Sequence, residues 1–204
     1  MLFEDTYRTI ENSAEGIFRD RGSKFIAYAY PINSEADIKN LLLVLKNEHP
    51  KANHHCWAVC IGIDRSVFRV NDDGEPSGTA GRPILNTILS YDLTNILVVA
   101  IRYFGGTLLG VPGLINAYKS ATDEALKTAI VIEKTINDFY TINFEYLQMN
   151  DIMKIIKDDN LTIINQEFDN NCSIQVSIRK TQVNATLAKL NKIVNLITKY
   201  DYSM

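Results

Sequence analysis

The sequence NILVVAIRYFGGTLLGVPGL at residues 95–114 contains an apolar run, a glycine-rich turn and the start of a second apolar segment in direct succession. Residues 95–103 are rich in Val, Ile and Leu and show no helical period, which predicts a buried β-strand. The turn spans residues 105–113, and apolar side chains then recur at helical spacing over 114–129. Because a helix with one apolar face needs a core to cover, this pattern predicts an α/β unit built around the strand.

Elements of alternating type extend the same unit towards the N-terminus. Apolar residues at i, i+3, i+4 and i+7 from Ile38 predict a helix that Pro50 ends. Pro83 suits the first turn of a further helix, which we expect to continue to about residue 90. The other apolar runs predict strands at 6–10, 16–18, 24–32, 56–63 and 67–70, the last two paired as a hairpin.

A second, smaller domain is expected at the C-terminal end. Apolar residues become sparse over 131–138, and a fresh β-α-β-β-α series then begins, so we predict domains at 1–134 and 135–204. The expected elements are strands at 140–147, 162–168 and 173–179 and helices at 151–157 and 182–197. In the last helix an apolar stripe is expected to cover one face of the sheet, formed by Val183, Leu187, Leu190, Val194 and Ile197.

Composition excludes several classes of protein. The chain has 204 residues, of which 46% are hydrophobic, and its net charge of −3 provides no general basic field for nucleic acids. Three cysteines, an odd number, favour thiols in a reducing compartment. The acidic N-terminus does not resemble a signal peptide, and the longest apolar run is far short of the roughly 20 residues that span a bilayer. We therefore expect a soluble, cytoplasmic protein without a membrane segment.

The segment 71–82 is unusually polar for a connection that leads into a helix. Its candidate binding residues are Asn71, Asp72, Asp73, Gly74, Glu75, Ser77, Gly78, Thr79, Gly81 and Arg82. In one interpretation the glycines let a partner approach the backbone, the hydroxyls and helix N–H groups face an anion, and the acids hold magnesium. In the other, the segment is a hairpin exit and helix cap in which Asp and Ser satisfy local backbone donors. Both interpretations remain open.

The segment 102–110 adds Arg102, Tyr103, Phe104, Gly105, Gly106 and Gly110 to the candidate surface. A strand that leads through a glycine turn into a helix is an arrangement that cradles phosphates, although the lysine of a P-loop and the dinucleotide fingerprint are absent. The alternative is that these glycines permit a tight turn and close packing. Arg102 closes an apolar strand, so we expect it to extend to the surface or to pair with Asp72 or Glu75.

The histidines His54 and His55 precede Cys56, and Cys60 follows four residues later. Imidazole and thiolate both bind zinc, but neighbouring residues of a strand point to opposite faces, so the two histidines are poorly placed to share one ion. One of them could instead face the 71–82 loop as a proton carrier or anion contact.

Together these motifs resemble the YigZ/IMPACT family, whose members carry an Impact N-terminal domain. The resemblance rests on HHCWA at 54–58, on NDDGEP at 71–76 with GTAGRP at 78–83, and on RYFGG at 102–106 with Gly110. It covers about residues 15–125, and the tail resembles the second domain of the bacterial, two-domain members.

The resemblance implies an α+β protein. Its first domain would have a ribosomal protein S5 domain 2-like fold, an α/β sandwich, and its second a ferredoxin-like fold, as in two adjacent domains of translation elongation factor G. Only residues 198–204 remain for the final ferredoxin-like strand, which we expect to be short or absent. Eukaryotic members regulate translation under stress by binding a ribosome-associated activator of an initiation-factor kinase, whereas bacterial members have no settled activity.

Two functional hypotheses follow. The first is a non-enzymatic, translation-linked regulatory or binding protein that contacts RNA, the ribosome or a protein partner through the glycine-rich loops, without catalytic residues, metal or cofactor. The alternative is a phosphate- or nucleotide-binding enzyme, in which Asp72, Asp73 or Glu75 holds Mg²⁺ or serves as a base.

Overall fold

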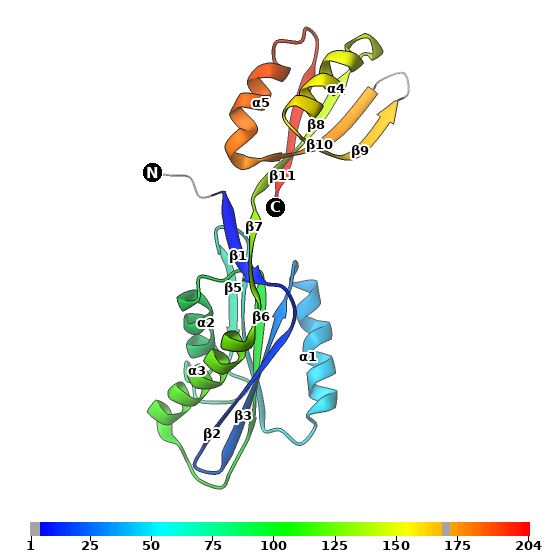
Figure 1. The fold of residues 1–204 in the computed structure, drawn as a ribbon. Coiled ribbons are helices and arrows are strands. Elements are labelled where there is room, and N and C mark those ends of the chain that lie inside the picture. Colours follow the sequence, from blue (N-terminus) through cyan, green and yellow to red (C-terminus); the bar gives the residue numbers. More distant parts are fainter. Residues whose placement is uncertain (1–4, 169–171) are drawn as a thin grey trace. The chain divides into compact units, whose positions relative to one another are not determined.

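The computed structural model describes residues 5–168 and 172–204, which divide into two compact units. The larger unit comprises Tyr7–Lys134, and the smaller unit comprises Thr135–Met204 together with Asp5 and Thr6. Both units combine strands and helices, so the α+β prediction is confirmed (Figure 1). None of the described helices combines the length and apolar character needed to cross a membrane.

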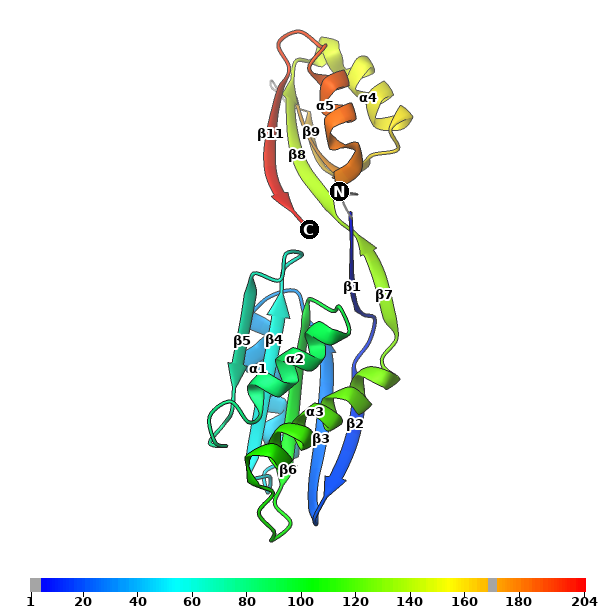
Figure 2. The ribbon, with the colours of Figure 1, turned by 90° about the vertical axis from the view of Figure 1, so that its left-hand side faces the viewer.

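A five-stranded sheet forms the centre of the larger unit. Its order is β2-β3-β6-β4-β5, and every pair of neighbours is antiparallel. Figure 2 shows α1 on one face of this sheet and α2 and α3 on the other. The bounds are β2 Ala14–Asp20, β3 Ser23–Pro31, α1 Ala36–Glu48, β4 His54–Ile61, β5 Val67–Asn71, α2 Gly81–Ser90, β6 Ile96–Tyr103 and α3 Gly110–Thr128.

Helices on both faces explain why β6 is apolar from Ile96 to Ile101 (Figure 2). Val98 and Ala100 belong to the core beneath α2 and α3, whereas Leu97 and Val99 belong to the core beneath α1. Each fully buried valine or leucine side chain of this kind contributes roughly 1.5–3 kcal/mol to folding. The sheet therefore has two apolar faces, and its loops lie at its ends.

The predicted hairpin is confirmed, because β4 and β5 pair from Trp57 opposite Asn71 to Ile61 opposite Val67. A short strand was missed where the sequence indicates only a domain boundary. This strand, β7 (Val131–Thr135), pairs with β1 (Thr6–Ile10) in a separate two-stranded sheet. None of its side chains is fully buried, so it lacks the apolar alternation by which strands are recognised.

The smaller unit has the βαββαβ order of a ferredoxin-like fold. Its antiparallel sheet has the strand order β11-β8-β10-β9, and one apolar core joins the sheet to its helices. The elements are β8 Asn137–Phe144, α4 Met149–Asp158, β9 Thr162–Phe168, β10 Cys172–Arg179, α5 Val183–Leu190 and β11 Ile197–Ser203.

Two predictions about the C-terminal end are wrong. The final strand is present as the seven-residue β11, six residues of which pair with β8, and α5 ends at Leu190 rather than at 197. Val194 and Ile197 therefore leave the predicted apolar stripe and are 77% and 65% exposed. Helical spacing of apolar residues continues by coincidence through the turns at 191–195, where Asn195 has a φ of 62°, outside helical geometry.

Candidate functional site

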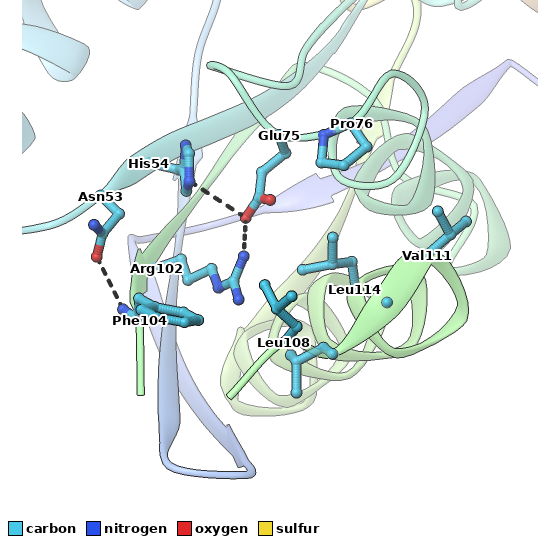
Figure 3. Close-up of a pocket in the computed structure, with 11 residues that line it drawn as sticks. Asn53, His54, Glu75, Pro76, Arg102, Phe104, Leu108, Val111 and Leu114 are labelled. Atoms are coloured by element: carbon cyan, nitrogen blue, oxygen red, sulfur yellow. Dashed lines mark hydrogen bonds and ion pairs between the residues drawn. The ribbon is translucent and has the colours of Figure 1, made fainter. Parts of the chain in front are cut away.

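The loops that follow β5 and β6 border one pocket of about 400 Å³ in the larger unit (Figure 3). Loop A is residues 72–80, and loop B is residues 104–109. The pocket is lined by Asn53, His54, Glu75, Pro76, Arg102, Phe104, Leu108, Leu109, Gly110, Val111 and Leu114. Five of the predicted site residues thus lie together, and they are joined by an apolar wall that sequence patterns did not indicate.

Strand register brings the polar groups of the pocket together. His54 on β4 lies opposite Arg102 on β6, so both side chains occupy the sheet face that α2 and α3 cover. Their neighbours His55 and Tyr103 belong to the opposite face, where the Tyr103 hydroxyl lies 2.8 Å from Nδ1 of His49. The prediction that the two histidines point apart is confirmed.

A buried ion pair forms the floor of the pocket. Oε1 of Glu75 accepts hydrogen bonds from Nη1 of Arg102 and from the Tyr118 hydroxyl, each at 2.7 Å. Nε2 of His54 lies 3.9 Å from the same oxygen. The expected contact of Arg102 with an acid of loop A is therefore made with Glu75, and not with Asp72.

Asp72 caps α2 from within the chain. Its Oδ1 accepts the N–H groups of Ala80 at 3.1 Å and Gly81 at 2.8 Å, and its Oδ2 accepts that of Gly78 at 2.9 Å. The sequence alone allows an external anion at these donors, but the protein supplies its own carboxylate there. The helix-cap interpretation therefore holds at this end of loop A.

Asp73 and Thr79 of loop A make hydrogen bonds within the loop and to the ends of β4 and β5. Oδ2 of Asp73 accepts the backbone N–H of His55 at 2.7 Å, and Oδ1 of Asn71 accepts the N–H of Asp73 at 2.7 Å. Nδ1–H of His54 donates to the Asp73 carbonyl at 2.8 Å, beside Gly74. The Thr79 hydroxyl donates to a carbonyl within the loop at 2.6 Å. Asp73 is thus engaged in local structure.

Five predicted residues of the 71–82 segment are exposed, and none of them lines the pocket: Asn71, Gly74, Ser77, Gly78 and Arg82. Ser77 and Gly78 belong to loop A, whereas Arg82 lies in the first turn of α2, next to the buried Gly81. These residues therefore lie on the outer surface of this region, outside the pocket.

Two buried residues, Cys56 and Tyr118, complete the network, and neither is among the binding residues predicted from the sequence. The Cys56 Sγ atom lies 3.0 Å from the Asp72 carbonyl oxygen and 3.3 Å from the Tyr118 hydroxyl. Burial raises the pKa of the Cys56 thiol and of the Tyr118 phenol well above their usual ranges. Both groups are therefore protonated at neutral pH. Helical spacing over 114–129 predicts a helix face that packs on the core, but it does not reveal that the hydroxyl of Tyr118 bonds to Glu75.

Arg102 keeps unused hydrogen-bonding capacity. Its Cζ atom lies 5.5 Å from the ring centroids of Phe25 and Phe104, and the residue is 6% exposed. Only Nη1 makes a hydrogen bond within the part of the chain that the structure describes, and Nε is buried without a partner. Figure 3 shows the side chain extending from its strand towards Glu75, with Phe104 beside it.

Loop B is held by close backbone contact. A Cβ atom on Gly105 would lie 1.9 Å from the carbonyl carbon of Gly22, and the N–H of Gly105 donates to the Ser23 hydroxyl at 3.1 Å. Gly106 and Gly110 have φ angles of 84° and 70°, which favour glycine. At Gly105 the close-packing interpretation holds.

The described residues contain no cluster of side chains that would support a zinc or magnesium site. Within residues 5–168 and 172–204, no group of three or more His, Cys, Asp or Glu side chains could hold a metal ion. His54 and His55 separate onto opposite faces, and the acids of loop A bond to protein donors.

Known proteins resemble most of this chain. The model of the Impact N-terminal domain matches residues 21–126. An IMPACT family member from Haemophilus influenzae is 33% identical over 83% of this chain and 84% of its own. The family member YvyE from Bacillus subtilis is 27% identical over 93% and 88%, and YigZ from Escherichia coli is 32% identical over 82% and 83%.

Solved structures extend the comparison. The crystal structure of a protein described as hypothetical covers 98% of this chain and 99% of its own, with 28% identity and a TM-score of 0.76. A structure described as the two-domain translational regulator Yih1 is 29% identical over 63% of this chain and 49% of its own, with a TM-score of 0.36. Similarity to the first structure thus spans both units.

Proposed function

This chain belongs to the IMPACT family, and we propose that it is a non-enzymatic, translation-linked binding protein that contacts RNA, the ribosome or a translation-associated protein. The contact would be made by the loop surface, which we define as the exposed parts of loops A and B with the first turn of α3. Yih1 is described as a translational regulator, and that description motivates the link to translation for a sequence of the same family.

The observation that carries this proposal is the engagement of all three acids of loop A. Asp72 caps α2, Asp73 binds the His55 N–H, and Glu75 pairs with Arg102. An enzyme that used these carboxylates to hold Mg²⁺ or to take a proton would first have to break these bonds. The polar character of loop A is better explained as the internal support of a preformed surface.

Exposed apolar side chains around the pocket support binding. Leu108 is 81% exposed, and Phe104 and Val111 also present apolar surface to solvent. These three residues line the mouth of a pocket whose floor is the Glu75–Arg102 pair. Concave apolar surface with a few placed polar groups is typical of binding sites.

Affinity capture of the tagged full chain from cell lysate at native salt tests this proposal. We expect ribosomal RNA, ribosomal proteins or translation factors to be retained, and the double variant Phe104→Ala, Leu108→Ser to lose them. The control, Leu43→Ser with Val44→Ala, alters two exposed apolar side chains of α1. If both variants retained the same ribosomal RNA, ribosomal proteins or translation factors and had unchanged thermal stability, the loop surface would be rejected as the binding site.

A second measurement addresses the enzymatic alternative. Thermal denaturation is followed with mononucleotides and Mg²⁺, because a ligand at 100 times its dissociation constant stabilises by about 2.7 kcal/mol. We expect no such stabilisation. A Mg²⁺-dependent shift that Asp72→Asn abolishes would favour the enzyme.

A further inference from the structure

The first turn of α3 lacks the internal anion that α2 has. α3 is a 19-residue helix whose N-cap residue, Leu109, makes no side-chain cap, and its first turn contains no acidic residue. Gly110 and Val111 of this turn line the pocket. The positive end of a helix dipole and its unsatisfied N–H groups favour a negative charge.

Arg102 provides an independent indication of a ligand. The residue is more than nine-tenths buried and lines the same pocket, where Glu75 bonds only to Nη1. Nε also lacks a partner but is itself fully enclosed, so the donor left for an acceptor in the pocket is Nη2, which makes no hydrogen bond within the described chain. The planar fork of an arginine matches a carboxylate or a phosphate.

The charges around the pocket favour a monoanion. Among the lining residues Arg102 is the one arginine or lysine, and Glu75 already balances it. The helix terminus then adds only about half a positive charge. Pro112 also removes one N–H from the first turn. A phosphate dianion or a nucleic-acid strand would require more compensation than these groups supply.

The apolar walls of the pocket indicate the chemistry of the rest of the ligand. Phe104, Leu108 and Leu114 are apolar, and a volume of about 400 Å³ is near the lower limit for ligand pockets. Such a space suits one apolar side chain with its carboxylate. Capture of a chain terminus by backbone N–H groups is a known mode of peptide recognition.

We propose that this pocket binds a carboxylate attached to an apolar group, the chemistry of a polypeptide C-terminus that ends in an apolar residue. The carboxylate lies between the first turn of α3 and Arg102, and the apolar group contacts Phe104 and Leu108. A free apolar acid has the same chemistry. The inference rests on the proposed function, because it assigns the recognition point within the loop surface.

Titration of the ¹⁵N-labelled full chain tests the proposal. The probes are a hexapeptide ending in leucine with a free carboxylate, the same peptide amidated, N-acetyl-leucine, and AMP. We expect the free acids to shift the amide signals of Gly110 and Val111, and the amidated peptide to bind at least about tenfold more weakly, since a charge-assisted hydrogen bond is lost. Peptide binding well above that of N-acetyl-leucine identifies a chain terminus, and the reverse order identifies a free acid.

A matched pair of variants locates the site. Val111→Asp places a carboxylate in the first turn of α3, where it competes for the same N–H groups and stabilises the helix. Val44→Asp is its control, because the two valines are 52% and 50% exposed on helices of the same unit. We expect Val111→Asp to weaken binding of the free acid at least about tenfold with little change in melting temperature, and Val44→Asp to bind as wild type.

Three results would overturn the inference: equal binding of the free and amidated peptides, binding of AMP in preference to the acids, or equal binding by the two variants. The two proposals fail separately. If no acid binds while lysate capture still depends on Phe104 and Leu108, only the carboxylate pocket is rejected. If the acids bind but capture from lysate does not depend on Phe104 and Leu108, the loop surface is rejected as the translation-linked binding site.

Discussion

Glu75 and Arg102 form a buried ion pair at 2.7 Å although 27 residues separate them in the chain. The pair joins loop A to the end of β6, and the Tyr118 hydroxyl attaches α3 to the same carboxylate. Three segments of the larger unit therefore meet at one oxygen atom. The loop surface is built on this junction, so its geometry should depend on the pair.

Glu75→Gln should destabilise the larger unit by about 3–5 kcal/mol, because it leaves the Arg102 charge buried without compensation. Urea unfolding measured by the fluorescence of Trp57, the single tryptophan, gives the free energy. The matched control is Glu35→Gln, which breaks the exposed pair with Arg69 and should cost less than about 1 kcal/mol. Equal losses in the two variants would contradict the buried-pair argument.

Asp72→Ala should destabilise the larger unit by about 0.5–2 kcal/mol, because the N–H groups of Gly78, Ala80 and Gly81 lose their common acceptor. Asp72→Asn retains one side-chain oxygen and should lose less. The same urea experiment measures both. If the alanine variant were as stable as wild type, the carboxylate would have no capping role.

Asp5 should make the stability of the smaller unit depend on pH under acidic conditions. Hydrogen bonds from Arg179, and then from Thr181, lower the pKa of the Asp5 carboxyl from 3.8 to about 2. A folded-state pKa below the unfolded value means that the contribution is complete above about pH 4 and is lost as pH falls towards 2. The stability difference between wild type and Asp5→Asn should therefore shrink over that range, as measured by unfolding at each pH. A constant difference would show that the carboxylate charge does not matter.

The thiols of Cys56 and Cys60 should resist modification in the folded protein. Burial raises both pKa values, so little of the reactive thiolate forms near neutral pH. Labelling with a thiol reagent at pH 8 should be slower by on the order of 100-fold than in urea, with sites assigned by peptide mass spectrometry. Rapid labelling of Cys56 in the native chain would argue instead for an accessible, activated thiol.

Local periodicity predicted the elements that bury a regular apolar face. The strand at 95–103, the hairpin and the helices after Pro83 and the 105–113 turn all appear close to their expected positions. β7 was missed because its side chains are partly or fully exposed, and the last helix was overextended because helical spacing continued through residues that form a turn and β11. In both cases pairing with a distant strand determines the structure.

The candidate site was likewise predicted only in part from the sequence. Composition and motif spacing singled out residues 71–82 and 102–110, and they indicated that Arg102 would meet an acid. They did not indicate Leu108 and Val111 as the mouth of a pocket, because nothing in an apolar sequence pattern distinguishes an exposed wall from a core.

The sequence by itself determined most element types, the polar loops and the family, since each is encoded in residues that lie close together along the chain. Tertiary structure alone decided that Asp72 caps α2, that Glu75 pairs with Arg102, and that α3 keeps an uncapped N-terminus beside the pocket. The reason is physical. A carboxylate bonds to the donors that the fold brings within about 3 Å: for Asp72 they lie six to nine residues further along the chain, and for Glu75 they come from β6 and α3.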